Sequence, residues 1–452
     1  MNASPSTFPV IPALVHRHVQ DAAFYWSQLD WTLGSPLVGL ERLHHFHRLL
    51  DAHLDGIETA GSAGWDAAYA SLERWRKPGE AFSCVTVAAR HRHSAQLDQV
   101  SKLICRHPGQ LVRGAVSALA WCDDDDFASV AHQWSGDEAE PAVQVAVLRA
   151  VGLKGRHSMG CLRHPLSHYM QASDPHIRGA AWRAIGSVTA EEHTGEEALA
   201  TLRARALSDA DLAVRAEAAI ASMRHAGPAA LPVLWACVEA QVALQRQATG
   251  WPRAQGERRL RRWVRHLALA VPLQSPLVPS ALALLPPREA LTFVFYHGDL
   301  AQLPFVVDQM ADPGVGRYAG WVWYCLTGLD LSAHGLTLAE TPPGLLDASQ
   351  PVTDAQLDAD NGLRQPDAAA VRRFMQGWQV PTHDERVLLG GPLNVERALD
   401  VLRHAPQALR AIVSHMLAQR EVPVRIDVRG RIRDQLDAID RMEEWMNERV
   451  AA

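Results

Sequence analysis

The segment Asp174-Pro-His-Ile-Arg-Gly-Ala-Ala-Trp-Arg-Ala-Ile185 decides the fold of this chain. Its apolar residues stand at positions i, i+4, i+7 and i+8, which lie on one face of an α-helix; they are Ile177, Ala181, Ala184 and Ile185. Asp174 and Pro175 indicate where the helix begins, because an aspartate caps free N–H groups and proline lacks the donor that would stay unpaired there. The segment therefore predicts an amphipathic helix with one buried face.

The same four offsets occur three more times. The copies begin at Leu111, Val143, Ile177 and Leu212, which are 32, 34 and 35 residues apart. The three other sets are Leu111, Ala115, Ala118, Leu119; Val143, Val147, Ala150, Val151; and Leu212, Ala216, Ala219, Ile220. A period of this length leaves room for a second helix, and such hairpins bury their apolar faces only by stacking. We predict an all-α solenoid of antiparallel helix pairs, and the pattern resembles the short, degenerate class of HEAT repeats.

Composition limits the class of protein. The chain has 452 residues, is 48% hydrophobic and carries a formal net charge of −6, so it can form a large core and lacks the basic character of a dedicated nucleic-acid binder. Its six cysteines form no C-x-x-C pair, which indicates buried thiols in a reducing compartment. No signal sequence or long apolar run is visible. We expect a cytoplasmic protein with no membrane partner and no cofactor.

Two parts of the chain resemble one particular family. The first part comprises His18-Val-Gln-Asp-Ala-Ala-Phe-Tyr-Trp26, Leu50-Asp-Ala-His-Leu-Asp-Gly-Ile57 and Ala60-Gly-Ser-Ala-Gly-Trp65, with Asp21 at the family's usual acidic position. The second part comprises Asp312-Pro-Gly-Val-Gly-Arg-Tyr-Ala-Gly320 and Leu326-Thr-Gly-Leu-Asp-Leu331. These segments, and more weakly Arg386-Val-Leu-Leu-Gly-Gly-Pro392, resemble an uncharacterised bacterial family of HEAT-like proteins encoded in type VI secretion gene clusters. The resemblance implies an accessory role in type VI secretion.

The pattern predicts four parts of the chain. A helical N-terminal cap covers 1–106, and the repeat solenoid covers 107–338, with an Arg-rich insertion near 245–270. An acidic, Pro-containing linker or loop covers 339–368, and a smaller helical part covers 369–452. The repeat offsets return after the insertion, first in a possible set at Leu277, Ala281, Leu284, Leu285 and then at Val315, Ala319, Val322, Trp323.

The Arg-rich segment is the candidate partner-binding site. Its arginines are Arg253, Arg258, Arg259, Arg261, Arg262 and Arg265, with Trp251 and Trp263 between them. Such a run can be a solvated helix face, a protein interface that pairs with carboxylates, or a surface that holds phosphates and stacks on bases. It can also contact the acidic segment 339–368 of the same chain. We select the protein interface as the working hypothesis.

Three groups of residues have the chemistry of metal ligands. His157, Cys161, His164 and His168 follow the spacing H-x₃-C-x₂-H-x₃-H, but Gly160 and Pro165 interrupt the helix that would align them. The other groups are His44, His45, His47 and His53 on one predicted helix, and the aspartates Asp123–Asp126 in a predicted hairpin turn. Neither shows converging ligands or the spaced oxygens and glycine of a calcium loop. We expect no metal site in any of them.

No catalytic motif is present, neither G-x-S-x-G, H-E-x-x-H, a P-loop nor a dinucleotide fingerprint. The sequence therefore predicts a non-enzymatic protein-binding scaffold, which the resemblance places with a secretion effector or its spike-tip carrier. An immunity protein that neutralises a cognate toxin is an alternative. A HEAT-like enzyme acting on nucleic acid through the Arg-rich helix is another. The oligomeric state stays open.

Overall fold

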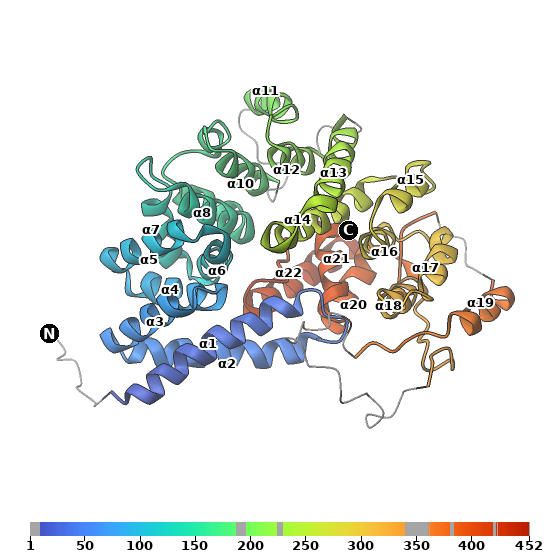
Figure 1. The fold of residues 1–452 in the computed structure, drawn as a ribbon, viewed down its shortest axis with the longest axis horizontal. Helices are drawn as coiled ribbons and strands as arrows, with labels where there is room; N and C mark the ends of the chain where they lie inside the picture. The colour runs from blue at the N-terminus through green and yellow to red at the C-terminus, as the bar shows by residue number, and fades with distance from the viewer. Residues whose placement is uncertain are drawn as a thin grey trace. The chain divides into compact units, whose positions relative to one another are not determined.

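The computed structural model describes residues 10–186, 196–223, 229–339, 360, 362–379, 384–418, 422 and 424–451. These residues are overwhelmingly helical, and the predicted all-α helical-repeat fold is confirmed. The chain forms two compact units (Figure 1). Unit 1 contains 1–34, 38–225 and 418–452, and unit 2 contains 35–37 and 226–417.

Unit 1 consists of helix pairs and a C-terminal helix. In chain order its elements are α1 (Pro12–Thr32), α2 (Leu40–Thr59), α3 (Ser62–Trp75), α4 (Pro78–His91), α5 (Ser94–Arg106), α6 (Pro108–Trp121), α7 (Asp124–Trp134), α8 (Pro141–Lys154), the 3₁₀ helix η1 (Arg156–Cys161), α9 (Leu166–Tyr169), α10 (Pro175–Ile185), α11 (Glu196–Ala206), α12 (Leu212–Ser222) and α22 (Ile432–Ala451). Helices α4, α6, α8, α10 and α12 form one row, in which each packs against the next.

The four predicted apolar sets lie on α6, α8, α10 and α12. All of their residues are buried except Ile185, Leu212 and Ile220, which are half-buried. The row also includes a copy that the sequence analysis did not identify. On α4 the buried residues Ala81, Val85, Ala88 and Ala89 have the same four offsets. The helices of this row approach closely, since a Cβ atom on Gly114 of α6 would lie 2.0 Å from the Pro78 carbonyl oxygen.

The helix start predicted at Asp174 is confirmed. Its side chain accepts hydrogen bonds from the backbone N–H groups of His176 and Ile177, at 2.7 and 3.3 Å. Asp211 caps α12 in the same way. The preceding Asp209 instead accepts two hydrogen bonds from Arg178 of α10, both at 2.9 Å. A side-chain pair therefore ties these two repeats together beside the apolar contact.

The C-terminal segment belongs to unit 1. Arg425 donates a hydrogen bond to the Gly152 carbonyl oxygen near the end of α8. Arg431 and Arg433 each donate to Asp123 Oδ1 at 2.7 Å. Helix α22 then packs against α2. Residues more than 270 positions apart are thus joined through arginine side chains.

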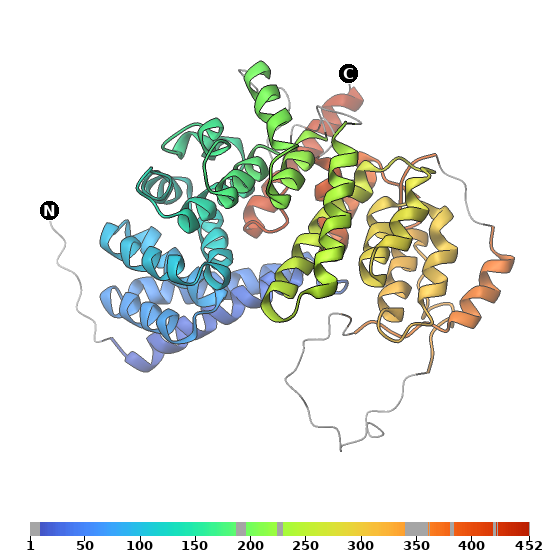
Figure 2. The same cartoon turned by 45° about the horizontal axis from the view of Figure 1, so that its top comes forward.

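Unit 2 repeats the paired arrangement. Its elements are α13 (Ala230–Gln247), α14 (Gly250–Ala270), α15 (Leu277–Leu284), α16 (Pro287–His297), the 3₁₀ helix η4 (Leu300–Gln302), α17 (Leu303–Gln309), α18 (Gly316–Thr327), α19 (Ala368–Gly377), the strands β1 (Val387–Leu388) and β2 (Gly391–Pro392), α20 (Val395–His404) and α21 (Gln407–Leu417). Figure 2 shows the long helices α13 and α14 side by side. Helix α14 packs on α16, which packs on α18.

The buried faces in unit 2 follow the same rule. The predicted set Val315, Ala319, Val322 and Trp323 lies buried at α18. In the set suggested at Leu277, only Ala281 and Leu285 are buried. The Arg-rich helix α14 carries the four offsets itself, in the fully buried residues Leu260, Val264, Leu267 and Ala268. Its apolar face is therefore a repeat face, and its arginines occupy the remaining surface.

A short hairpin caps the C-terminal ends of α16 and α18. Strands β1 and β2 pair antiparallel across a two-residue turn at Leu389 and Gly390, both with positive φ. Val387 N–H donates to the Gly298 carbonyl, and the turn N–H groups donate to the carbonyls of Cys325 and Leu326. Last-turn carbonyls lack partners within a helix, so the hairpin provides them. Glycine is required at position 390, because a Cβ atom there would lie 2.5 Å from the Thr327 carbonyl oxygen.

Arg386 extends this cap to α14. Its guanidinium donates hydrogen bonds to the carbonyls of Ala268, Leu269 and Val271, at 3.2, 2.8 and 2.8 Å. It also donates to the carbonyl of His297 at 2.6 Å. A cation at helix C-termini is favoured by the negative end of the helix dipole. One side chain therefore closes two helices at once.

The buried His297 makes the stability of unit 2 depend on pH. Burial, with a further contribution from the Arg386 charge, lowers the pKa of His297 to about 4. The unfolded state takes up a proton near pH 6.5, and the folded state only near pH 4. The contribution of His297 to the free energy of unfolding is therefore fully present above about pH 6.5 and decreases as the pH falls towards 4. We expect a loss of about 3 kcal/mol over this range from this group.

Denaturant unfolding of the wild type and of His297→Gln, measured from pH 7 to pH 4, tests this expectation. The stability advantage of the wild type should shrink as pH falls, since only the wild type carries the titrating ring. A difference between the two proteins that stays constant with pH would show that His297 titrates alike in the folded and unfolded states.

Candidate functional site

The six predicted arginines lie on α14 and are not equivalent. Arg253 and Arg258 are exposed, and Arg259, Arg261, Arg262 and Arg265 are half-buried. Three of the half-buried side chains contact neighbouring groups within unit 2. The Arg259 guanidinium lies 5.9 Å from the ring centre of Trp263, that of Arg265 lies 5.4 Å from the ring centre of Tyr296, and that of Arg261 lies 4.0 Å from Glu289. Arg261 and Arg265 thus contact α16, whereas Arg259 covers a ring of its own helix.

Two of the six arginines line a cleft in unit 2. The cleft has a volume of about 520 Å³, and Arg253 and Arg261 meet there with Arg246 of α13 and Arg288 of α16. Its apolar lining comes from Val242 and the segment 283–286, and its acidic lining from Glu257 and Glu289. The sequence analysis identified neither Arg246 nor Arg288, because they lie outside the Arg-rich run on two other helices. The cleft is positively charged on balance and has an apolar wall.

The cleft arginines differ in how far they are already neutralised. Arg253 pairs with Glu257 of the next helical turn at 3.1 Å, and both side chains are exposed. Glu289 is nearly buried, and burial raises the pKa of its carboxyl although Arg261 opposes this shift. Arg246 is exposed and forms no hydrogen bond or ion pair with any residue that the structure describes. The cleft charge that no described carboxylate already neutralises therefore lies at Arg246, whereas Arg253 is exposed but paired.

Arg288 has a partner from the predicted acidic segment. It donates two hydrogen bonds to the Asp360 carboxylate, at 2.6 and 2.9 Å, and the Asp360 side chain is nearly buried. Burial opposes the charge of Arg288, yet the hydrogen bond and charge of Asp360 raise its pKa overall. Residues 340–359 and 361 of the predicted linker lie outside the described residues. Asp360 of the acidic segment thus pairs with Arg288 of α16.

The His157–His168 motif does not form one site. Residues 156–161 form the 3₁₀ helix η1, and α9 begins only at Leu166 after Pro165, so the expected interruption of the helix is confirmed. His157 lies 3.4 Å from Asp124, whereas His164 and His168 lie beside Asp137. Cys161 is half-buried and free.

The histidines of α2 also separate. His47 is buried and accepts a hydrogen bond from the Ile432 N–H at 3.0 Å. His53 lies 3.0 Å from the His18 ring and 3.7 Å from Asp21. Burial lowers the pKa of His53 although Asp21 opposes the shift. Because His44 and His45 are exposed, the four side chains serve different environments.

The four aspartates at the start of α7 bind different cations of the protein itself. Asp123 pairs with Arg431 and Arg433, and Asp124 pairs with Lys154 at 3.0 Å. Asp125 and Asp126 both pair with Arg92, at 3.7 and 2.8 Å. These carboxylates diverge, and they also lie where the positive end of a helix dipole favours them.

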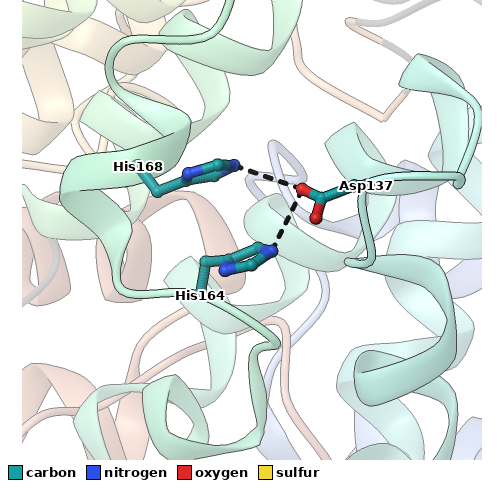
Figure 3. A group of neighbouring side chains, drawn as sticks. All are labelled: Asp137, His164 and His168. Carbon is teal, nitrogen blue, oxygen red and sulfur yellow. Dashed lines mark ion pairs between the residues drawn. The ribbon is translucent and has the colours of Figure 1, made fainter.

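Among the described residues, side chains that could bind a metal ion do lie together in one cluster, and the cluster includes a residue absent from every predicted set. His164 and His168 approach Asp137, which lies in the loop between α7 and α8 (Figure 3). Asp137 was missed because it precedes these histidines by 27 and 31 residues. That separation is close to one repeat, and residues one repeat apart become neighbours when repeats stack.

The comparisons with known proteins agree with the repeat architecture. A family model described as HEAT repeats matches residues 133–221 and 165–251. These residues include α8 to α13, and the match supports a HEAT-repeat-like family for this part of the chain. No curated protein and no solved structure matches the chain. Among the described helices none has the length and apolar character needed to cross a bilayer.

Proposed function

We propose that the protein is a non-enzymatic scaffold that binds an acidic segment of a partner protein in the arginine-lined cleft of unit 2. HEAT repeats suggest a protein-interaction scaffold. The observation that carries the proposal is the meeting of four arginines from three helices beside an apolar wall. Arginine binds carboxylates through a planar, two-pronged set of donors, and apolar contact adds the area that a peptide needs.

The same cleft argues against nucleic acid as its ligand. Base stacking needs an accessible aromatic ring, and Trp263 is fully buried beneath Arg259. Glu257 and Glu289 also interrupt the positive lining of the cleft, so its arginines do not form the continuous track that a phosphate backbone follows. The net charge of the whole chain is −6. A protein partner with clustered carboxylates therefore fits better than a polyanion with regularly spaced phosphates.

Charge reversal within the cleft should abolish partner capture. We expect Arg246→Glu and Arg253→Glu to lose the proteins that the wild type co-precipitates from its native cells, because like charges then face the partner. The control is Arg373→Glu, which makes the same charge change at an exposed position of α19. All three variants should have the melting temperature of the wild type, because each replaced side chain is exposed.

Two further measurements decide between the ligand classes. Poly-glutamate should compete with the captured partner and poly-lysine should not, whereas DNA and RNA should cause no gel shift. Equal capture by the two cleft variants and the control would contradict the cleft as the binding site. A gel shift that Arg246→Glu abolishes would favour the nucleic-acid alternative.

The partner itself is proposed from the family resemblance. Segments within 13–65 and 107–331 resemble a family encoded in type VI secretion clusters, so we propose that the bound protein is a secretion effector or its spike-tip carrier. The alternative is a toxin neutralised by this chain. Co-expression distinguishes them: an immunity protein rescues cells from the captured protein's toxicity, whereas an adaptor is needed for its export.

The domain boundaries predicted at 106, 338 and 368 also stay proposals.

A further inference from the structure

Asp137, His164 and His168 form a compact, partly exposed group in unit 1. The Nε2 atoms of His164 and His168 lie 3.0 and 3.5 Å from the same oxygen, Oδ1 of Asp137. The candidate ligand atoms of the three residues all lie within 4.8 Å of one another. The two imidazole rings are stacked with centroids 4.2 Å apart, and Figure 3 shows both rings directed towards the carboxylate.

Buried contacts hold the two segments that carry this group. The hydroxyl of Tyr169, a buried residue, donates to the Ser135 carbonyl at 2.7 Å, and the His164 N–H donates to that hydroxyl at 3.3 Å. The Arg163 N–H donates to the Ser135 hydroxyl oxygen at 2.9 Å. On the other side, Gln144 donates to two carbonyls of the Asp137 loop. The group is therefore pre-organised by its surroundings rather than by its own pairing.

The alignment at His164 differs from that of a hydrogen bond. Its Nε2 atom is buried and makes no hydrogen bond with a described residue, although it lies 3.0 Å from the Asp137 oxygen. This nitrogen is therefore without a hydrogen-bond partner among the described residues while it faces the carboxylate, as a ligand of a shared ion would.

We propose that Asp137, His164 and His168 bind one divalent transition-metal ion of the zinc class, through one carboxylate oxygen and two imidazole nitrogens. Zinc bonds to these atoms at about 2.0–2.2 Å, so tetrahedral ligands lie roughly 3.3 Å apart. The observed separations of 3.0 and 3.5 Å fall on either side of that value. Two nitrogens favour zinc over magnesium or calcium, which prefer oxygen ligands. Three protein ligands would leave the fourth position of a tetrahedral ion to water.

The location gives the ion a structural role. In this repeat the second helix is replaced by η1 and the single turn α9, whereas α5 and α7 are continuous helices in the preceding repeats. The ion joins His168 of α9, and His164 two residues before this helix, to the α7–α8 loop of the preceding repeat. It therefore fastens the least regular element of the row. This proposal departs from our expectation of no metal site, which considered three groups of residues, none of which contained Asp137.

Zinc titration of the untagged, chelator-treated full-length protein tests the site. Calorimetry with ZnCl₂ should give one ion per chain and MgCl₂ should give none, and zinc should raise the melting temperature, because an ion that binds only the folded state stabilises it. His164→Ala/His168→Ala should lose the ion, and Asp137→Asn should weaken binding about tenfold or more. Cobalt should give the visible absorption of a tetrahedral site in the wild type and not in His164→Ala/His168→Ala.

The control separates the observed cluster from the sequence motif. His157→Ala/Cys161→Ala removes two members of H-x₃-C-x₂-H-x₃-H but no member of the cluster, and should bind zinc as the wild type does. Circular dichroism establishes that every variant is folded. No zinc binding by the wild type would overturn the proposal. Equal stoichiometry and affinity in His164→Ala/His168→Ala would also overturn it, by placing the ion elsewhere.

Discussion

Replacing Ala184 with glutamate is expected to unfold the row of helices in unit 1. Ala184 is fully buried on α10, which packs against both α8 and α12. A carboxylate there would be buried between packed helices, away from water. Burying an uncompensated charge costs on the order of 3–5 kcal/mol, which is a large fraction of the stability of an ordinary domain.

Because the chain has two compact units, the measurement must report on unit 1. Hydrogen–deuterium exchange of peptides from α8, α10 and α12 should show that the variant loses protection there. The matched control is Ala200→Glu, which makes the same change at an exposed position of α11 in the same unit. Equal protection in the two variants would contradict the placement of Ala184 at the contact between repeats.

Repeat faces were predictable where the four apolar offsets recur with a near-constant period or follow a recognisable Asp-Pro entrance. The four sets from Leu111 to Ile220 and the set at Val315 were found in this way. The copy on α4 was missed because it begins at Ala81, only 30 residues before Leu111, and because its helix carries Ser83 and Thr86 on buried positions. The polar groups of these two side chains bond to the carbonyls of their own helix, at Gly79 and Phe82. A hydropathy pattern therefore cannot show that these two polar side chains are buried.

The copy on α14 was hidden by charge. Its buried residues from Leu260 to Ala268 keep the offsets, but the arginines between them dominate the composition and suggested an insertion. Long arginine side chains tolerate this position, since their stems cover apolar surface while their heads reach water or a ring. Arg259 does so over the ring of Trp263. An arginine run therefore does not by itself separate an interface from a repeat face.

The two sites depended on contacts that no local pattern contains. The cleft takes its arginines from α13, α14 and α16, so a run on one helix identified only part of it. The cluster in Figure 3 joins a loop to a segment one repeat later. A search at separations of 27 to 35 residues, guided by the repeat period, would have paired Asp137 with His168. Spacing within one helix could not.

Removing the guanidinium of Arg386 is expected to lower the free energy of unfolding of unit 2 strongly. The side chain donates to four backbone carbonyls, of Ala268, Leu269, Val271 and His297, across α14 and α16. Arg386→Ala leaves these acceptors unpaired at the helix ends, and each buried unpaired group costs about 1–3 kcal/mol. Since neighbouring losses do not add fully, we expect a total of about 3–5 kcal/mol.

The conservative variant separates geometry from charge. Arg386→Lys keeps the cation near the helix C-termini but has no planar fork to span two helices, so it should recover only part of the loss. Arg373→Ala removes an exposed arginine of the same unit and should leave stability unchanged. Denaturant unfolding gives the differences, and hydrogen exchange at the last turns of α14 and α16 gives their location. Full recovery by Arg386→Lys would show that the positive charge at the helix ends is sufficient and that the shared hydrogen bonds are not required.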